Sequence, residues 1–92
     1  MIQSFKCIDT RNLFLTRRSK HWSNAQKVAL RKLDQLQLAT NLEDLLIPPG
    51  NKLEELKGDR KGQHSIRVND QYRLCFIWKE DGAHEVEIVD YH

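Results

Sequence analysis

The sequence predicts an α+β domain in which two N-terminal helices pack on a small antiparallel sheet, in the order β-α-α-β-β-β. Residues 72–78 are rich in β-branched and aromatic side chains and lack a helical period, which indicates a strand. Asp81-Gly82 and Asn69-Asp70 are turn signals on either side of this run, so its neighbouring strands should run antiparallel. Upstream, residues 23–39 repeat apolar side chains with the helical period.

The first elements follow from local signals. Residues 1–7 alternate in character and predict a short edge strand that joins the later sheet. Asp9 or Thr10 could cap a first helix, because either side chain can accept from the exposed amides of the first turn. Leu13 and Phe14 would form the buried side of that helix.

The second helix has a clearer start. Ser23 and Gln26 have the spacing of a capping box. Leu30 and Leu38 fall beside the apolar stripe and widen it. The stripe itself consists of Ala25, Val28, Ala29, Leu33, Leu36 and Ala39. Residues 47–51 contain paired prolines and a glycine, which end the helical region. Strands are then expected at 63–68, 72–78 and 84–89, with both flanking strands hairpin-connected to the middle one.

Size and charge restrict the function classes. The 92 residues fit one domain, 1–92. The net charge of +2 is slight, but cations crowd the first third and the predicted sheet, so a local basic surface can exist. No apolar run is long enough to cross a bilayer and no secretory signal is evident, which favours the cytoplasm and no membrane partner. Cys7 and Cys75 would stay reduced there, with Cys75 a small core residue.

Arg73 lies in the middle of the most apolar run. Alternation puts Arg73, Cys75 and Ile77 on one face of the strand and Leu74, Phe76 and Trp78 on the other. An arginine here is costly unless it is paired or reaches a cleft. One interpretation is an ion pair with a neighbouring carboxylate such as Glu87, and the other is an anion-binding role.

Residues that suit phosphodiester chemistry flank the predicted sheet. Such a reaction needs a cation to stabilise the developing phosphate charge, and groups that remove and supply protons. The segments 57–60 and 90–92 supply lysine, arginine, aspartate, tyrosine and histidine. A plain turn at 58–59 and an ordinary chain end are the alternatives, and residue types alone leave both open.

Metal and nucleotide sites are not supported. The four histidines and two cysteines show no ligand spacing, and no glycine-rich loop precedes a helix. No cofactor is therefore expected. The basic run 17–22 could contact phosphates through Arg17, Arg18 and Lys20, with Trp22 available for base stacking. A solvated helix end explains the same run.

The chain resembles the HigB family of bacterial toxins, in the RelE/ParE superfamily. The resemblance rests on residues 2–5, 56–66 (Leu-Lys-Gly-Asp-Arg-Lys-Gly-Gln-His-Ser-Ile), 72–76 (Tyr-Arg-Leu-Cys-Phe) and the terminal Asp-Tyr-His at 90–92. It implies a small antiparallel sheet with two N-terminal helices. It also implies a metal-independent, ribosome-dependent endoribonuclease that cuts messenger RNA in the decoding (A) site through attack of a ribose 2′-hydroxyl on the adjacent phosphate, and so inhibits translation.

The resemblance also implies partners. These are the 70S ribosome with its messenger and a HigA-like antitoxin with a helix-turn-helix fold. Operator DNA would be bound only through the toxin–antitoxin complex.

Carried over by position, Lys57 and Arg73 would hold the scissile phosphate. Tyr91 would orient or stack on a base or assist proton transfer, and Asp90 and His92 are acid/base candidates. Basic residues near the site, Arg60, Lys61 and Arg67, would contact RNA or the ribosome together with Arg17, Arg18 and Lys20. The sequence departs from some family members at Glu54, where they have a histidine, so the general base is unassigned.

Two other function classes remain open on sequence grounds. ParE-type relatives inhibit growth by binding DNA gyrase without cutting RNA, and fold alone does not separate these activities. The second class is a weakened toxin that acts mainly through its antitoxin complex. It stays open because Glu54 replaces a histidine found in some family members. A catalytic site requires the proposed residues to converge on one surface, whereas a binding toxin does not.

Overall fold

The structure, a computed structural model, describes residues 1–90, and it confirms the predicted α+β class. All strand pairs are antiparallel, and the sheet order is β1-β2-β3-β4. The helices are α1 (Ile8–Thr16) and α2 (Gln26–Leu38), and the strands are β1 (Glu54–Glu55), β2 (His64–Arg67), β3 (Tyr72–Lys79) and β4 (Gly82–Asp90). Short 3-10 turns are η1 (Leu42–Leu46), η2 (Pro49–Asn51) and η3 (Gly58–Arg60).

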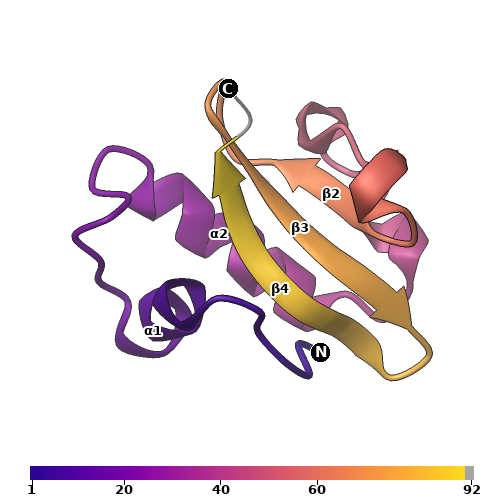
Figure 1. The fold of residues 1–92 in the computed structure, drawn as a ribbon, viewed down its shortest axis with the longest axis horizontal. Helices are drawn as coiled ribbons and strands as arrows, with labels where there is room; N and C mark the ends of the chain where they lie inside the picture. The colour runs from indigo at the N-terminus through magenta and orange to yellow at the C-terminus, as the bar shows by residue number, and fades with distance from the viewer. Residues whose placement is uncertain (91–92) are drawn as a thin grey trace.

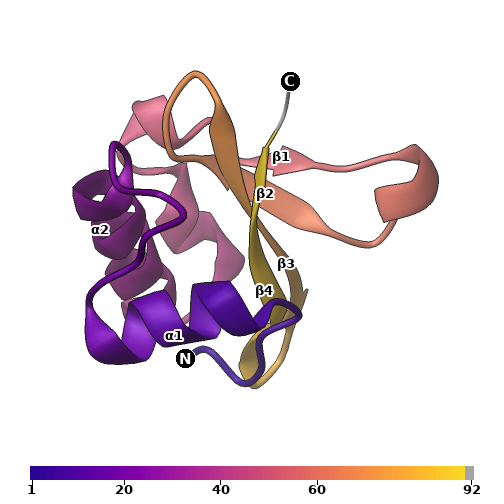
Figure 2. The same cartoon turned by 60° about the vertical axis from the view of Figure 1, so that its left-hand side comes forward.

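Both helices cover the same side of the sheet, and the β1–η3–β2 arm extends away from them (Figures 1 and 2). The core lies between these layers. Its fully buried side chains come from the helices and from alternate positions of the strands, as the pleat requires. They include Leu13, Leu33, Leu36, Ile66, Leu74, Phe76 and Val86. The helix period and strand alternation read from the sequence therefore identify the core correctly.

The N-terminal segment joins the sheet beside β4, but it does so through two isolated parallel bridges, Ile2–Ala83 and Phe5–Val86, and forms no continuous strand. Gly82 permits the close approach. A Cβ atom at Gly82 would lie 1.9 Å from the Met1 carbonyl oxygen, so any larger residue would push the segment away. The fourth strand of the sheet is β1, at the opposite edge.

Both helices begin differently from the sequence prediction. The capping box at Ser23 and Gln26 is wrong: α2 starts at Gln26 with no side-chain cap. The Gln26 side chain instead accepts from the Ser19 amide and donates to the Arg17 carbonyl, so it holds the loop between the helices. A capping box does form at Asn41 and Asp44, where it starts η1.

Helix α1 also starts without a side-chain cap. Its N-cap is Cys7, so Asp9 and Thr10 both lie inside the first turn and neither caps it. Thr10 is fully buried, and its hydroxyl accepts from the Ile88 amide at 3.1 Å. That hydroxyl therefore ties α1 to β4 and does not serve the helix end.

The turn between β3 and β4 also differs in detail. Gly82 has φ of 128°, whereas Asp81 has no positive φ, so the turn type expected for Asp81-Gly82 does not form. The Asp81 carboxylate is instead 2.6 Å from the His84 ring, and this hydrogen bond lowers the pKa of Asp81. Among residues 1–90, no helix has the length and apolar character to span a bilayer.

Candidate functional site

The sheet face away from the helices carries a row of polar and charged residues. Strand register pairs Glu54 with Ser65, Ser65 with Cys75, and Cys75 with Glu87. Directly paired residues of antiparallel strands project from the same face, so these four side chains share one surface, here called the open face. Arg73 lies on this face too, two residues before Cys75.

The Arg73 guanidinium is held by protein oxygens. Its Nε donates to Ser65 Oγ at 2.7 Å, and its Nη2 donates to the Lys52 carbonyl at 2.7 Å. The side chain is half-buried. These bonds offset the cost of placing a cation within the sheet and fix its orientation.

Glu87 pairs with Arg60, and not with Arg73 as one interpretation of the sequence suggested. Arg60 Nη1 donates to Glu87 Oε1 at 2.8 Å and to Gln63 Oε1 at 3.1 Å. Lys6 Nζ lies 3.9 Å from the same carboxylate oxygen. Arg60 is the last residue of η3, which connects β1 to β2, and its contact with Glu87 places its side chain on the open face.

Cys75 marks the point around which these charges gather. It is fully buried, and burial raises the pKa of its thiol. Charges on four side chains also act on the thiol, namely Arg60, Glu87, Arg73 and Glu54. A neutral, enclosed thiol is a poor nucleophile, which agrees with Cys75 as a packing residue. These two cations and two carboxylates, on the same face as Cys75, form the candidate site.

The predicted residues of η3 and the adjoining strands are close by but less enclosed. Lys57 and Lys61 flank η3 and are exposed. The Glu54 carboxylate is exposed, and within residues 1–90 neither it nor the Lys57 ammonium makes a hydrogen bond or ion pair. Arg67 pairs with Arg73 in register and forms an ion pair with Asp70.

The C-terminal candidates are placed only in part. Asp90 pairs with Tyr72, and Gln71 Nε2 donates to its carboxylate at 3.0 Å. Because Tyr72 directly precedes Arg73, the pleat turns Asp90 toward the opposite face from Arg73. Tyr91 and His92 lie outside the described residues.

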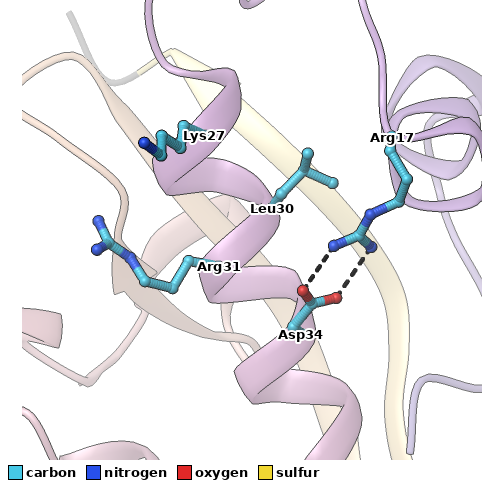
Figure 3. Close-up of a pocket in the computed structure, with 5 residues that line it drawn as sticks. All are labelled: Arg17, Lys27, Leu30, Arg31 and Asp34. Atoms are coloured by element: carbon cyan, nitrogen blue, oxygen red, sulfur yellow. Dashed lines mark hydrogen bonds and ion pairs between the residues drawn. The ribbon is translucent and has the colours of Figure 1, made fainter.

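Arg17, Arg18 and Lys20 lie elsewhere, around the two helices. A groove of about 330 Å³ lies between the helices. Arg17 reaches across it to Asp34 (Figure 3). The two hydrogen bonds of this pair are 3.0 and 2.6 Å long, and the Asp34 carboxylate raises the pKa of Arg17. Lys27, Leu30 and Arg31 complete the groove lining. Arg18 and Lys20 line a second hollow, with Ser19 and Gln26.

The basic run therefore forms a second cationic surface that the structure does not join to the open face. The stacking role suggested for Trp22 is wrong. Its side chain is only 9% exposed and belongs to the core cluster, so no base could stack on it. Within the described part of the chain, no three histidine, cysteine or acidic residues are grouped to hold a metal ion.

The sequence analysis considered Glu87 only as a partner of Arg73 and did not consider Ser65. Ser65 lies two residues before Arg67 on β2, so alternation places both residues on one face. The Lys52 carbonyl could not be predicted in this way, because every residue has a backbone carbonyl and the residue type does not show which one contacts Arg73.

Comparison with known proteins decides the family. The family model described as "RelE-like toxin of type II toxin-antitoxin system HigB" matches residues 13–92. The chain belongs to this HigB-like toxin family. The predicted resemblance is thus confirmed.

Two relatives are similar to this chain in sequence. The chain is 52% identical over 61 residues to the toxin HigB-1 of Vibrio cholerae serotype O1 (strain ATCC 39315 / El Tor Inaba N16961), covering 66% of this chain and 64% of that protein. It is 44% identical over 63 residues to an uncharacterized protein of Haemophilus influenzae (strain ATCC 51907 / DSM 11121 / KW20 / Rd), covering 68% and 62%. The chain thus spans just under two thirds of the length of these relatives.

The structural matches show the fold. The crystal structure of YafQ from E. coli strain BL21(DE3) superposes with a TM-score of 0.63 at 16% identity, covering 99% of this chain and 92% of that one. The YoeB–YefM complex from Staphylococcus aureus gives a TM-score of 0.62 at 18% identity, covering 100% and 98%.

Proposed function

We propose that this chain is the toxin of a type II toxin–antitoxin pair and acts as a ribosome-dependent endoribonuclease. It would cut messenger RNA in the ribosomal A site and so inhibit translation and growth. The observation that carries the proposal is the gathering of Arg73, Arg60 and Glu54 on one open sheet face, around a buried and neutral Cys75. Family membership supports the toxin role.

The open face supplies the groups that phosphodiester cleavage needs. Arg73 would bind the scissile phosphate and stabilise its developing charge, with Lys57 as a second cation. Glu54 would take the proton from a ribose 2′-hydroxyl as O2′ attacks phosphorus. This forms a cyclic phosphate and releases the 5′-oxygen, which takes a proton from an acid. No step in this scheme requires a metal ion.

Glu54 is favoured as the base by its position. Its register partner is Ser65, whose hydroxyl accepts from Arg73 Nε. Glu54 on β1 and Arg73 on β3 therefore lie on the same face, on either side of Ser65 in β2. Of the three C-terminal candidates for the general acid and for orienting the nucleobase, Tyr91 and His92 are retained, because Asp90 projects to the face opposite Arg73.

The remaining cations would contact RNA or the ribosome. Arg60, Lys61 and Arg67 border the open face, where they would follow the messenger backbone. Arg17, Arg18 and Lys20, on the helix side, would touch a separate phosphate segment.

The partners of the proposed toxin follow from its family. We infer a HigA-like helix-turn-helix antitoxin, a 70S ribosome carrying messenger, and operator DNA reached only through the toxin–antitoxin complex. The similar fold of the Staphylococcus aureus protein was solved as a YoeB–YefM complex, which supports a protein partner here. A cytoplasmic location follows from these partners.

The test is primer extension on a translated messenger in a reconstituted system, with and without ribosomes. The wild type should give cuts only when ribosomes are present, and Arg73→Ala should lose them by about a hundredfold or more. Arg11→Ala is the matched control, because Arg11 is an exposed cation on α1 outside both cationic surfaces, and it should cut normally.

Two outcomes would redirect the proposal. Cuts on naked RNA would mean a free ribonuclease. An absence of cuts with growth still arrested in cells would indicate a binding toxin of the gyrase-inhibitor type.

A further inference from the structure

Asn51 is a fully buried polar residue at the end of η2, in the segment that connects η1 to β1. Its amide nitrogen donates to the Leu45 carbonyl at 3.1 Å and to Gln35 Oε1 at 3.0 Å. Its amide oxygen accepts from Lys32 Nζ. Both ends of the amide are thus satisfied by groups from α2 and η1, which fixes the loop to the helix layer.

Lys32 contributes to this anchor from the face of α2. Burial lowers the pKa of Lys32, and the charges of Arg31 and Arg67 act in the same direction. A half-buried ammonium is costly without an acceptor. The Asn51 amide oxygen supplies that acceptor, so Lys32 helps to hold Asn51 in place.

The next residue connects this anchor to the open face. Lys52 has φ of 47° and ψ of 54°, a left-handed conformation that an ordinary side chain disfavours. Its carbonyl oxygen accepts from Arg73 Nη2 at 2.7 Å. A continuous path therefore runs from α2 through the hydrogen bonds of Asn51 and the Lys52 backbone to the guanidinium.

We propose that Asn51 is a positioning residue for Arg73, acting through the Lys52 carbonyl. The proposal rests on the phosphate-binding role proposed for Arg73. A guanidinium already oriented for the transition state needs no reorganisation during the reaction, and small misplacements of such a group reduce the rate strongly. The Lys52 backbone accepts an unfavourable conformation because the anchored loop holds it there, as strained residues near functional sites commonly are.

The first test is hydrogen exchange of arginine Nη–H groups by NMR in the free protein, because Nη2 of Arg73 donates to the Lys52 carbonyl, with the Arg73 signal assigned through its loss in Arg73→Lys. Asn51→Ala should speed exchange at Arg73 by about tenfold, while the Arg17 signal, held by Asp34, stays unchanged. Thr10→Val is the matched control, since it also removes a buried hydrogen bond but lies on the opposite side of the sheet from Arg73.

A second variant separates positioning from stability. Lys52→Gly relieves the left-handed strain, so the protein should be at least as stable by urea denaturation, yet Arg73 exchange should rise by about threefold because the carbonyl is freer. Lys52→Asn removes the same charge and keeps a residue that tolerates this conformation, so its Arg73 exchange should match the wild type.

Cleavage kinetics complete the test. Asn51→Ala should lower kcat by about tenfold and leave KM within about twofold, because an interaction of the transition state is lost. Unchanged Arg73 exchange in folded Asn51→Ala, or an equal rise in Thr10→Val, would overturn the positioning role. If the wild type gives no ribosome-dependent cuts, the proposed function fails, whereas the exchange data still decide the positioning role.

Discussion

The two faces of β3 differ although their central residues are buried alike. Leu74 and Phe76 face the helices, whereas Cys75 and the half-buried Arg73 face the open side. Apolar side chains cover the first pair, and ionised groups surround the second. Residues of β3 are therefore covered in two ways. One face excludes water through packing, and the other encloses its residues with charges that a substrate could engage.

The strongest effect is expected on the packed face. Phe76→Ala should lower the free energy of unfolding by about 3–5 kcal/mol, since it removes a fully buried ring from the core. Urea denaturation followed by circular dichroism measures it. Arg73→Ala in the same assay should lose clearly less. An equal loss of unfolding free energy in Arg73→Ala would show that Arg73 is a structural residue and that the two faces of β3 do not differ in this respect.

The next prediction concerns the chemistry of the open face. Glu54→Gln should reduce ribosome-dependent cleavage by about a hundredfold, because the amide cannot accept the 2′-hydroxyl proton. Single-turnover primer extension measures this rate. Glu55→Gln is the matched control: Glu55 is the adjacent residue, pairs with His64 and projects to the other face. Similar losses in both variants would remove Glu54 from the base role.

A smaller effect is expected at the Arg60–Glu87 pair. Glu87→Gln should cost about 1–3 kcal/mol of unfolding free energy, because the charged acceptor of Arg60 is lost while Arg60 stays largely covered. The same variant should bind RNA more tightly, since one negative charge leaves the face.

The control for this pair is Glu85→Gln, an exposed acid on the same strand, which should change the unfolding free energy little. A double-mutant cycle with Arg60→Gln isolates the pair energy. A coupling near zero would show that Glu87 does not hold Arg60.

The two thiols should differ in reactivity with little effect on stability. Because burial raises the pKa of Cys75, a smaller fraction of it is thiolate at any given pH, and the proportion grows only as pH approaches the raised value. Iodoacetamide at about pH 8 should therefore alkylate the half-buried Cys7 at least about tenfold faster than Cys75.

Mass spectrometry of the intact protein resolves the two alkylation steps. Cys7→Ser leaves only the slow step, and unfolding in urea should remove the difference. Fast alkylation of native Cys75 would show that the open face does not enclose its thiol.

Local patterns predicted most of the fold. Alternation in residues 72–78 gave β3 its two faces, and the apolar stripe gave α2 its buried side, because both depend on residue spacing alone. The predicted caps of both helices were wrong because spacing alone does not show which partner a side chain binds. Ser23 and Gln26 have the correct spacing for a capping box, but Gln26 finds better partners in the loop before it. The stacking role predicted for Trp22 was wrong because basic neighbours in the sequence do not indicate whether a side chain enters the core.

Residue order was enough to establish the fold class, the apolar stripe of α2 and the position of Arg73 on the strand face opposite Leu74 and Phe76. The partners of Arg73 required the folded chain, because they come from β2 and from a loop 21 residues away. The same holds for the pairing of Glu87 with Arg60, and for the separation of the basic run from the open face. Periodicity is a property of neighbouring residues, whereas the pairing of side chains depends on loops whose path the whole core fixes.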